Sequence, residues 1–255
     1  MKVSQVAASL IAVLGLSLSA ASQAQTVLKI GWTNTIDSHY GVMATTFNDE
    51  IVKRTNGRYK LQYFPSSALG GEREMLEAVQ LGTQEMVITS TGPTGNFVPD
   101  TRIVDIPFLF RDYDHARKVL DGPIGDAILT KFPAKGLVAI AWMENGFRHI
   151  TNSARAVEKV EDLAGLKLRV IPNPINLDWV KAFGANPVPL AFPEVYTALE
   201  QKVVDGQENP LTVIAANKFF EVQKYLTLTY HQYNPQSIII SKRVWDGMSA
   251  AEQAL

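Results

Sequence analysis

Two arginines and one compact polar run are the residues of this sequence whose types best suit chemistry. Arg148, in ENGFRHITN, and Arg169, in KLRVIP, lie among apolar residues that alternate as β-strands do. A guanidinium removed from water needs an anion, and its planar fork suits a carboxylate. One strand arginine is usually an edge residue or half of a structural ion pair. Two arginines in one region, each close to an expected loop, favour a site for an organic acid.

The polar run lies in VVDGQENP, where Asp205-Gly206 indicates a turn and Pro210 holds the preceding residue extended. Residues 207–209, Gln-Glu-Asn, are consistent either with an ordinary solvated loop or with a third part of the site. Composition alone favours the loop slightly.

The elements that must position these residues form two α/β units. Alternating apolar residues predict strands at 27–33, 59–65 and 85–91, and helical periodicity predicts helices at 39–57 and 71–82. This β-α-β-α-β order implies a parallel sheet with helices on its faces. The strand ends at Thr33, Pro65 and Thr91 would share the carboxyl edge, where such sheets bind ligands.

The pattern restarts near residue 146, after an expected helix at 112–132 and a strand at 137–143. Strands are expected at the segments beginning with Phe147, Lys167 and Asn186, and helices at 173–184 and 193–206. Two further strands are expected at 225–229 and 237–242. The strands of the 137–152 region would join the two units.

The first 24 residues are typical of a signal peptide. Lys2 precedes an apolar run rich in Ala and Ser, and Ser22 and Ala24 supply small residues for cleavage before Gln25. The alternative is an uncleaved N-terminal anchor. No other apolar run approaches the ~20 residues that span a membrane. The sequence contains no cysteine, so an exported chain of this size without disulfides fits a bacterial periplasm.

Composition and motifs argue against several functions. The formal net charge is -1, which gives no general attraction to nucleic acid or anionic lipid. The sequence lacks the G-x-S-x-G, H-E-x-x-H, G-x-x-x-x-G-K-[ST] and G-x-G-x-x-G motifs, and its four histidines lack metal-ligand spacing. We therefore expect no catalytic residues, no metal and no cofactor.

Four blocks in the same order and spacing resemble the substrate-binding proteins of tripartite ATP-independent periplasmic (TRAP) transporters, the DctP-type family. The blocks are ALGGEREMLEAVQLGTQEM, DIPFLF, GLKLRV and AFPEVYTALEQKVVDGQENP, and the resemblance runs from about residue 27 to the end. It implies that Arg169 pairs with the substrate carboxylate, that Arg148 is the second arginine and that Asn209 shares the carboxylate. It also implies that Phe192 is the aromatic wall and that Glu72 is the acidic residue of the pocket.

The resemblance further implies an α/β fold of the periplasmic binding-protein type, a two-lobed clamshell. Each lobe would be a mostly parallel sheet flanked by helices, with hinge strands between the lobes. The expected boundaries are 1–24 for the signal peptide, 25–145 for lobe I, 146–235 for lobe II and 236–255 for a return to lobe I. The expected partners are a small organic acid and the small and large permease subunits, with the protein itself a monomer in the periplasm. Family members continue into long C-terminal helices, so the resemblance implies that the chain is truncated.

Further polar residues are candidates for the pocket: His39, Asn145, Asn173 and Gln207. Each could equally be a loop cap. A set rich in amides satisfies hydroxyl groups as both donor and acceptor, and Glu72 would disfavour a second carboxylate on the ligand. The sequence therefore favours a sugar acid, such as the hexuronates glucuronate and galacturonate. A C4-dicarboxylate or a short hydroxy or keto acid is the alternative ligand, and a secreted enzyme or a purely structural periplasmic protein are the alternative classes.

Overall fold

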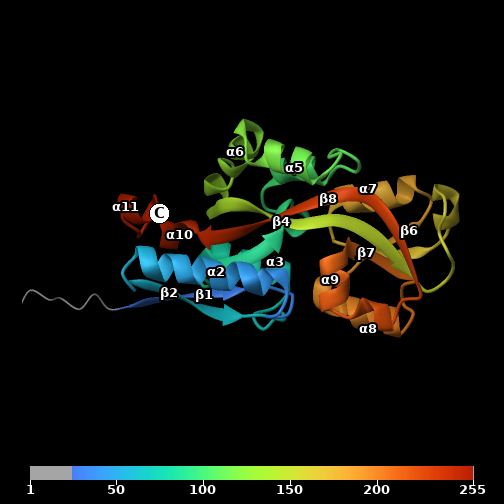
Figure 1. Cartoon of the computed structure of the whole chain (residues 1–255), viewed down its shortest axis with the longest axis horizontal. Helices are drawn as coiled ribbons and strands as arrows, with labels where there is room; N and C mark the ends of the chain where they lie inside the picture. Colours follow the sequence, from blue (N-terminus) through green and yellow to red (C-terminus); the bar gives the residue numbers. More distant parts are fainter. Residues whose placement is uncertain (1–24, 255) are drawn as a thin grey trace, which may run out of the picture.

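The computed structural model describes residues 25–254, so the predicted signal peptide lies outside the described residues. Eight strands form one sheet in the order β2-β1-β3-β8-β4-β7-β5-β6 (Figure 1). The strands are β1 Thr26–Gly31, β2 Tyr59–Phe64, β3 Met86–Ser90, β4 Leu137–Asn152, β5 Lys167–Val170, β6 Asn186–Pro189, β7 Gly206–Pro210 and β8 Tyr225–Ser241. The α-helices are α2 His39–Arg54, α3 Glu72–Leu81, α4 Thr91–Thr94, α5 Tyr113–Leu120, α6 Pro123–Leu129, α7 Pro174–Ala182, α8 Val195–Glu200, α9 Leu211–Ala216, α10 Lys242–Trp245 and α11 Ala250–Gln253.

Two bodies share this sheet. We call β1–β3 with α2–α6 lobe I, and β5–β7 with α7–α9 lobe II; the long strands β4 and β8 run through both (Figure 1). Strand pairs within each lobe are parallel, whereas β3–β8, β4–β8 and β4–β7 are antiparallel. The predicted α/β fold with hinge strands is therefore confirmed. The residue boundaries between the lobes stay predictions.

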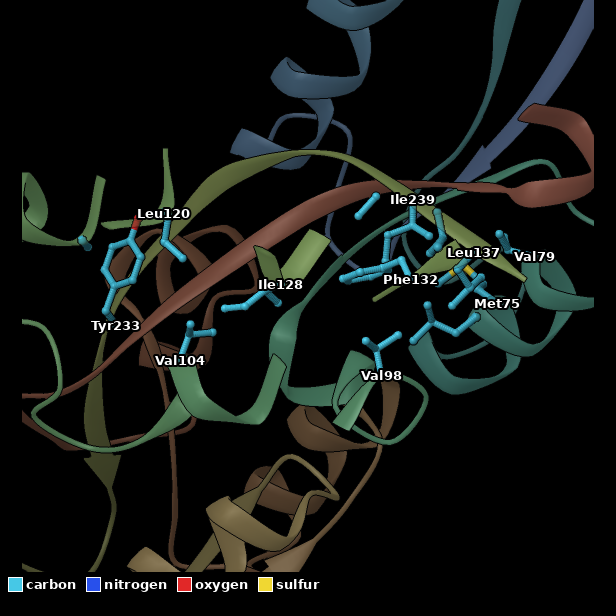
Figure 2. Close-up of a cluster of buried hydrophobic side chains, with 14 of the residues drawn as sticks. Met75, Val79, Val98, Val104, Leu120, Ile128, Phe132, Leu137, Tyr233 and Ile239 are labelled. Carbon is cyan, nitrogen blue, oxygen red and sulfur yellow. The ribbon is translucent and has the colours of Figure 1, made fainter. Parts of the chain in front are cut away.

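Each lobe has apolar cores of its own. In lobe I, Met75 and Val79 of α3 pack with Phe132, Leu137 and Ile239 (Figure 2). In lobe II a separate cluster forms around Leu168, Val170 and Trp179. The two lobes therefore do not share one apolar core.

Three details of the predicted elements were wrong. The polar run 207–209 is not a loop but the middle of β7, which is buried throughout because it pairs with β4 on one side and β5 on the other. The helix expected at 112–132 is two helices, since Pro123 begins α6 and its ring cannot continue the preceding helix. The two strands expected within 225–242 are one strand, β8.

Two smaller differences concern the ends of elements. Arg148 lies inside β4 and not beside a loop, while Arg169 lies one residue from the end of β5, as predicted. The helix expected at 193–206 starts with a 3₁₀ turn and ends at Glu200. Within residues 25–254, no helix has the length and apolar character needed to cross a membrane.

Candidate functional site

A narrow polar chamber lies between the two lobes, at the ends of several strands. The centre of a water molecule can move within only about 10 Å³ of this chamber, so the chamber has room for roughly one water molecule. Its wall combines residues of both lobes and of the hinge strand β4: Thr33, Asn34, Tyr40, Glu72, Ser90, Asn145, Arg148, Arg169, Ile171, Phe192, Asn209 and Val213. Six of the nine predicted site residues are in this list.

Arg169 is a buried cation with no ion-pair partner among the described residues. Its side chain is 1% exposed, and Nε and Nη2 donate to the carbonyl oxygen of Leu190 at 2.9 and 2.7 Å. The third nitrogen, Nη1, is buried and has no hydrogen-bond partner in the described part of the chain. Burial lowers the pKa of Arg169 to about 10, against the opposing charge of Glu208, so the guanidinium stays protonated at neutral pH. The backbone thus orients this cation without neutralising it.

Arg148 has the opposite arrangement. Its Nε and Nη2 grip the carboxylate of Glu208, with Nη2 at 2.8 Å from Oε1, and Nη1 donates to Asn234 Oδ1 at 3.0 Å. Both partners of the pair are essentially unexposed. Burial alone would raise the pKa of Glu208, but the charge of Arg148 and the bond with His231 outweigh burial and hold the pKa at about 2. Arg148 lines the chamber as predicted, yet it is half of a structural ion pair.

Glu72 brings a carboxylate to the lobe I side of the chamber. It begins α3, and its Oε1 accepts from Thr89 Oγ1 at 3.1 Å. Burial raises the pKa of Glu72, and the charge of Arg169 opposes this shift. Glu72 forms no ion pair with Arg169 in the described structure, although both line the same chamber. A ligand between them can therefore contact both.

Asn145 and Asn209 reach the chamber on strands of the hinge and of lobe II. Asn145 lies where the β4–β8 register shifts between Glu144 and Gly146, an irregularity that re-aims a side chain. Its Nδ2 donates to Asn234 Oδ1 at 2.8 Å. Asn209 donates through Nδ2 to Gln207 Oε1, which fixes the orientation of its amide. These two predicted residues are held in place at the chamber wall.

The structure does not bring the other three predicted residues to the chamber wall. Gln207 is fully buried and spends both ends of its amide on protein, bonding Asn209 and Thr151, so it supports Asn209 from behind. His39 lies behind Asn145, with Nε2 at 2.9 Å from Asn145 Oδ1. Asn173 caps α7 instead, because its Oδ1 accepts from the backbone N–H of Ile175 at 2.9 Å.

Phe192 separates the chamber from two more open clefts. Its ring lies 6.0 Å from the Arg169 guanidinium carbon, a distance consistent with a cation–π contact. The same residue lines a cleft with Arg73 and Pro172 and, on the other side, a cleft with Ser66 and Asn217. Phe192 is therefore a partition as well as an aromatic wall.

The sequence analysis missed several residues of the wall as candidates. Tyr40 is 2% exposed and no described side chain hydrogen-bonds its hydroxyl, which leaves that group to the chamber. The feature of the sequence that could have identified Tyr40 as a site residue is its place in the first helical turn after the first strand-helix junction. Thr33 had been expected at the ligand-binding edge, and Ser90 directly precedes Thr91, which had been expected there too. Asn34, Ile171 and Val213 gave no local signal, because only the folded chain brings their segments together.

Within residues 25–254, no group of three or more His, Cys, Asp or Glu side chains could hold a metal ion. The chamber is lined by Arg169, which has no ion pair among the described residues, by Arg148 of the compensated pair, by the carboxylate of Glu72 and by several neutral polar groups. Bacterial extracellular solute-binding protein, family 7, the DctP family, matches residues 31–255. The chain belongs to this family.

Similar proteins support the assignment to the DctP family. A TRAP periplasmic solute-binding protein from Polaromonas sp. JS666, solved with bound D-erythronate, is 62% identical with a TM-score of 0.89, covering 90% of this chain and 76% of that one. The sugar acid binding protein DctPAm from Advenella mimigardefordensis, in complex with galactonate, is 40% identical with a TM-score of 0.88, covering 90% and 74%. The 2,3-diketo-L-gulonate-binding periplasmic protein YiaO of Escherichia coli is 43% identical over 94% of this chain and 73% of its own length.

DctP-family members of TRAP systems are periplasmic proteins that bind small organic acids and work with membrane permease components. They are binding proteins for transport and not enzymes. The predicted family and the predicted class of function are thereby confirmed.

Proposed function

We propose that this chain captures a small hydroxylated monocarboxylate, a sugar acid, and delivers it to a TRAP permease. The observation that carries the proposal is the buried, unpaired Nη1 of Arg169 in a chamber whose other arginine is neutralised. One uncompensated cation suits one carboxylate. A charge-assisted hydrogen bond to such a group contributes roughly 1.5–3 kcal/mol.

The rest of the ligand would face neutral polar groups. Tyr40, Thr33 and Ser90 offer hydroxyls, and Asn145 and Asn209 offer amides; all five line the chamber. Such groups both donate to and accept from ligand hydroxyls. Glu72, on the side contributed by lobe I, accepts a hydroxyl proton but repels a second carboxylate. This asymmetry favours a sugar acid over a C4-dicarboxylate.

The number of carbon atoms in the ligand is the finer part of the proposal. The sequence analysis favours a hexuronate, but the chamber is narrow and the 62% identical relative holds D-erythronate, a four-carbon acid. Room for about one water molecule holds neither acid, so the lobes must open for both, and a six-carbon acid demands a wider opening or a displacement of Phe192. We therefore propose a short aldonate first and a six-carbon sugar acid second. We also propose that the protein acts as a periplasmic monomer after loss of residues 1–24.

The test is calorimetric titration of the protein with a matched panel: D-erythronate, galactonate, glucuronate, galacturonate and succinate. Erythritol, which lacks the carboxylate, and butyrate, which lacks the hydroxyls, separate the two halves of the proposal. We expect D-erythronate to bind most tightly, erythritol not to bind and butyrate to bind at least tenfold more weakly. If erythritol binds as tightly as erythronate, the proposal that a carboxylate is recognised is contradicted. A preference for succinate would select the dicarboxylate alternative.

The role of Arg169 is tested in the same titration. Arg169→Ala should lower ligand affinity more than tenfold, because loss of even one charge-assisted bond in a buried site costs roughly 1.5–3 kcal/mol. The matched control is Arg155→Ala. Arg155 also donates only to backbone carbonyls, of Asp162 and Ala164, but it is exposed and does not line the chamber. Equal binding by both variants would refute the role of Arg169.

A further inference from the structure

Two sets of amide contacts join the lobes directly, on opposite sides of the chamber. On one side, Asn173 Nδ2 of lobe II donates to the carbonyl oxygen of Gly92 in lobe I at 2.7 Å. Next to it, Asn96 Nδ2 of lobe I donates to the carbonyl oxygen of Pro172 at 2.8 Å. On the other side, Asn217 Nδ2 donates to Asn34 Oδ1 at 2.7 Å. These contacts are between protein atoms only.

Asn173 does two separate things with its two amide atoms. Its oxygen caps α7 within lobe II, and its nitrogen reaches across to lobe I. The side chain is 1% exposed and is absent from the chamber wall. The residue can therefore influence binding without touching a ligand.

The backbone of lobe I is shaped for this approach. A Cβ at Gly92 would lie 2.8 Å from Ile171 Cδ1, and a Cβ at Gly95 would lie 3.0 Å from Asn173 Nδ2. Neither glycine has a positive φ, so the backbone conformation does not require glycine at these positions. At Gly92 the closeness of Ile171 in lobe II requires it, and at Gly95 both Asn173 of lobe II and Arg102 Cγ of lobe I, at 2.9 Å, leave no room for a Cβ.

We propose that the Asn173–Gly92 contact is a latch that stabilises the closed arrangement of the lobes and thereby sets ligand affinity. The inference rests on the proposed function, since it assumes that lobe closure accompanies ligand capture. A contact made only in the closed arrangement favours that arrangement whether or not a ligand is present. Apparent affinity then follows the closed population, so losing the latch weakens binding by the factor by which that population falls.

Asn173→Asp isolates the latch from the helix cap. Aspartate retains the oxygen that caps α7, but it has no N–H for Gly92 and sets a carboxylate against a carbonyl. We expect about tenfold weaker binding of the acid identified in the panel, through faster dissociation, with the thermal midpoint of the ligand-free protein unchanged. The matched control is Asn186→Asp, another lobe II amide that donates to a backbone carbonyl, of Gly165, but within its own lobe. The affinity of Asn186→Asp for the ligand should equal that of the parent protein.

Gly92→Ala is the second variant, because it disturbs the approach of the lobes without altering Asn173. Its added methyl group meets Ile171 and should also weaken binding about tenfold. If Asn173→Asp lowers the thermal midpoint of the ligand-free protein, this variant still decides the question. Parent-like affinity in both variants overturns the latch.

A ligand-free measurement separates failure of the latch from failure of the proposed function. The chain has no cysteine, so Lys60→Cys in lobe I and Lys181→Cys in lobe II, both exposed, accept spin labels at defined positions. Pulsed electron paramagnetic resonance should show longer distances in Asn173→Asp and Gly92→Ala than in the parent. If no acid of the panel binds the parent, the proposed function fails while this distance shift still supports the latch. Identical distance distributions overturn it.

Discussion

Arg148 and Arg169 show how two similar residues acquire different roles. Both are arginines buried in strands, yet only Arg148 has an acidic partner. The difference arises from strand register: Arg148 lies opposite Pro210 in the β4–β7 ladder, which places Glu208 diagonally across from it on the same face. The sequence could show that both guanidiniums need anions. It could not show which anion is supplied by the protein, because the register joins segments about 60 residues apart.

The ion pair gives a prediction at the scale of the residue. Glu208→Gln should lower the free energy of unfolding by about 3–5 kcal/mol, since it leaves the buried charge of Arg148 uncompensated while preserving side-chain volume. Urea unfolding at neutral pH measures the change. Glu77→Gln is the control, because its pair with Arg73 is exposed and should contribute less than about 0.5 kcal/mol. Equal stability of the two variants would show that the buried pair contributes no more than a surface pair.

Elements differ in how well their sequences predict them. The strands β1–β3 and the helices α2 and α3 of lobe I follow period-two and period-3.6 patterns, because each has one face toward a core, and their bounds were predicted to within a few residues. β7 escaped prediction because its residues Gln207, Glu208 and Asn209 are polar although the strand is buried on both faces. Gln207 and Glu208 bond Thr151 and Arg148 on β4, and Asn209 bonds Gln207 within β7; the local sequence pattern does not show these contacts. The functional part of the fold is thus the part that departs from hydrophobic patterning.

Asp105 provides a prediction for the 3₁₀ element Pro99–Asp105 that supports the hinge. Its carboxylate is fully buried, accepts from Thr91 Oγ1 at 2.6 Å and leaves Oδ2 without a partner in the described structure. Burial raises its pKa from 3.8 to about 7, against hydrogen bonding by Thr91 and the charge of Arg148. At pH values between 3.8 and about 7, Asp105 is protonated in the folded protein but ionised in the unfolded chain. Proton binding by Asp105 therefore adds to the free energy of unfolding. This contribution is complete below pH 3.8 and is lost as the pH rises through about 7.

Asp105→Asn should remove this contribution to the pH dependence. The fall it eliminates is on the order of 4 kcal/mol between acidic and mildly alkaline pH, so the variant should gain stability relative to the parent as pH rises. Urea unfolding across that range measures the slope. Asp100→Asn, at the exposed start of the same element, should leave the slope as it is in the parent. Parallel slopes for Asp105→Asn and the parent would mean that the carboxyl ionises normally in the fold.

The whole molecule combines two cores with one sheet. The lobes have separate apolar clusters, which favours independent bodies, but β4 and β8 remain paired from Leu137–Ser241 at one end to Asn152–Tyr225 at the other (Figure 1). The sequence predicted the two bodies and the joining strands. It did not predict the width of the chamber, because that depends on how closely Gly92 and Asn173 bring the lobes together.

The β4–β8 ladder, which extends through both lobes with three register shifts, predicts how the protein unfolds. Because neither lobe can lose its part of the ladder without exposing strand edges of the other, scanning calorimetry should show one transition. A ligand that binds only the folded protein, at 100 times its Kd, adds about 2.7 kcal/mol. This should raise the midpoint by about 5–10 °C for a chain of this size. Arg169→Ala, at the same ligand concentration, should show at most about half of this rise, because a tenfold loss of affinity leaves the ligand at about 10 times its Kd. Two separate transitions, or a rise confined to one of them, would mean that the hinge strands join the lobes without coupling their stability.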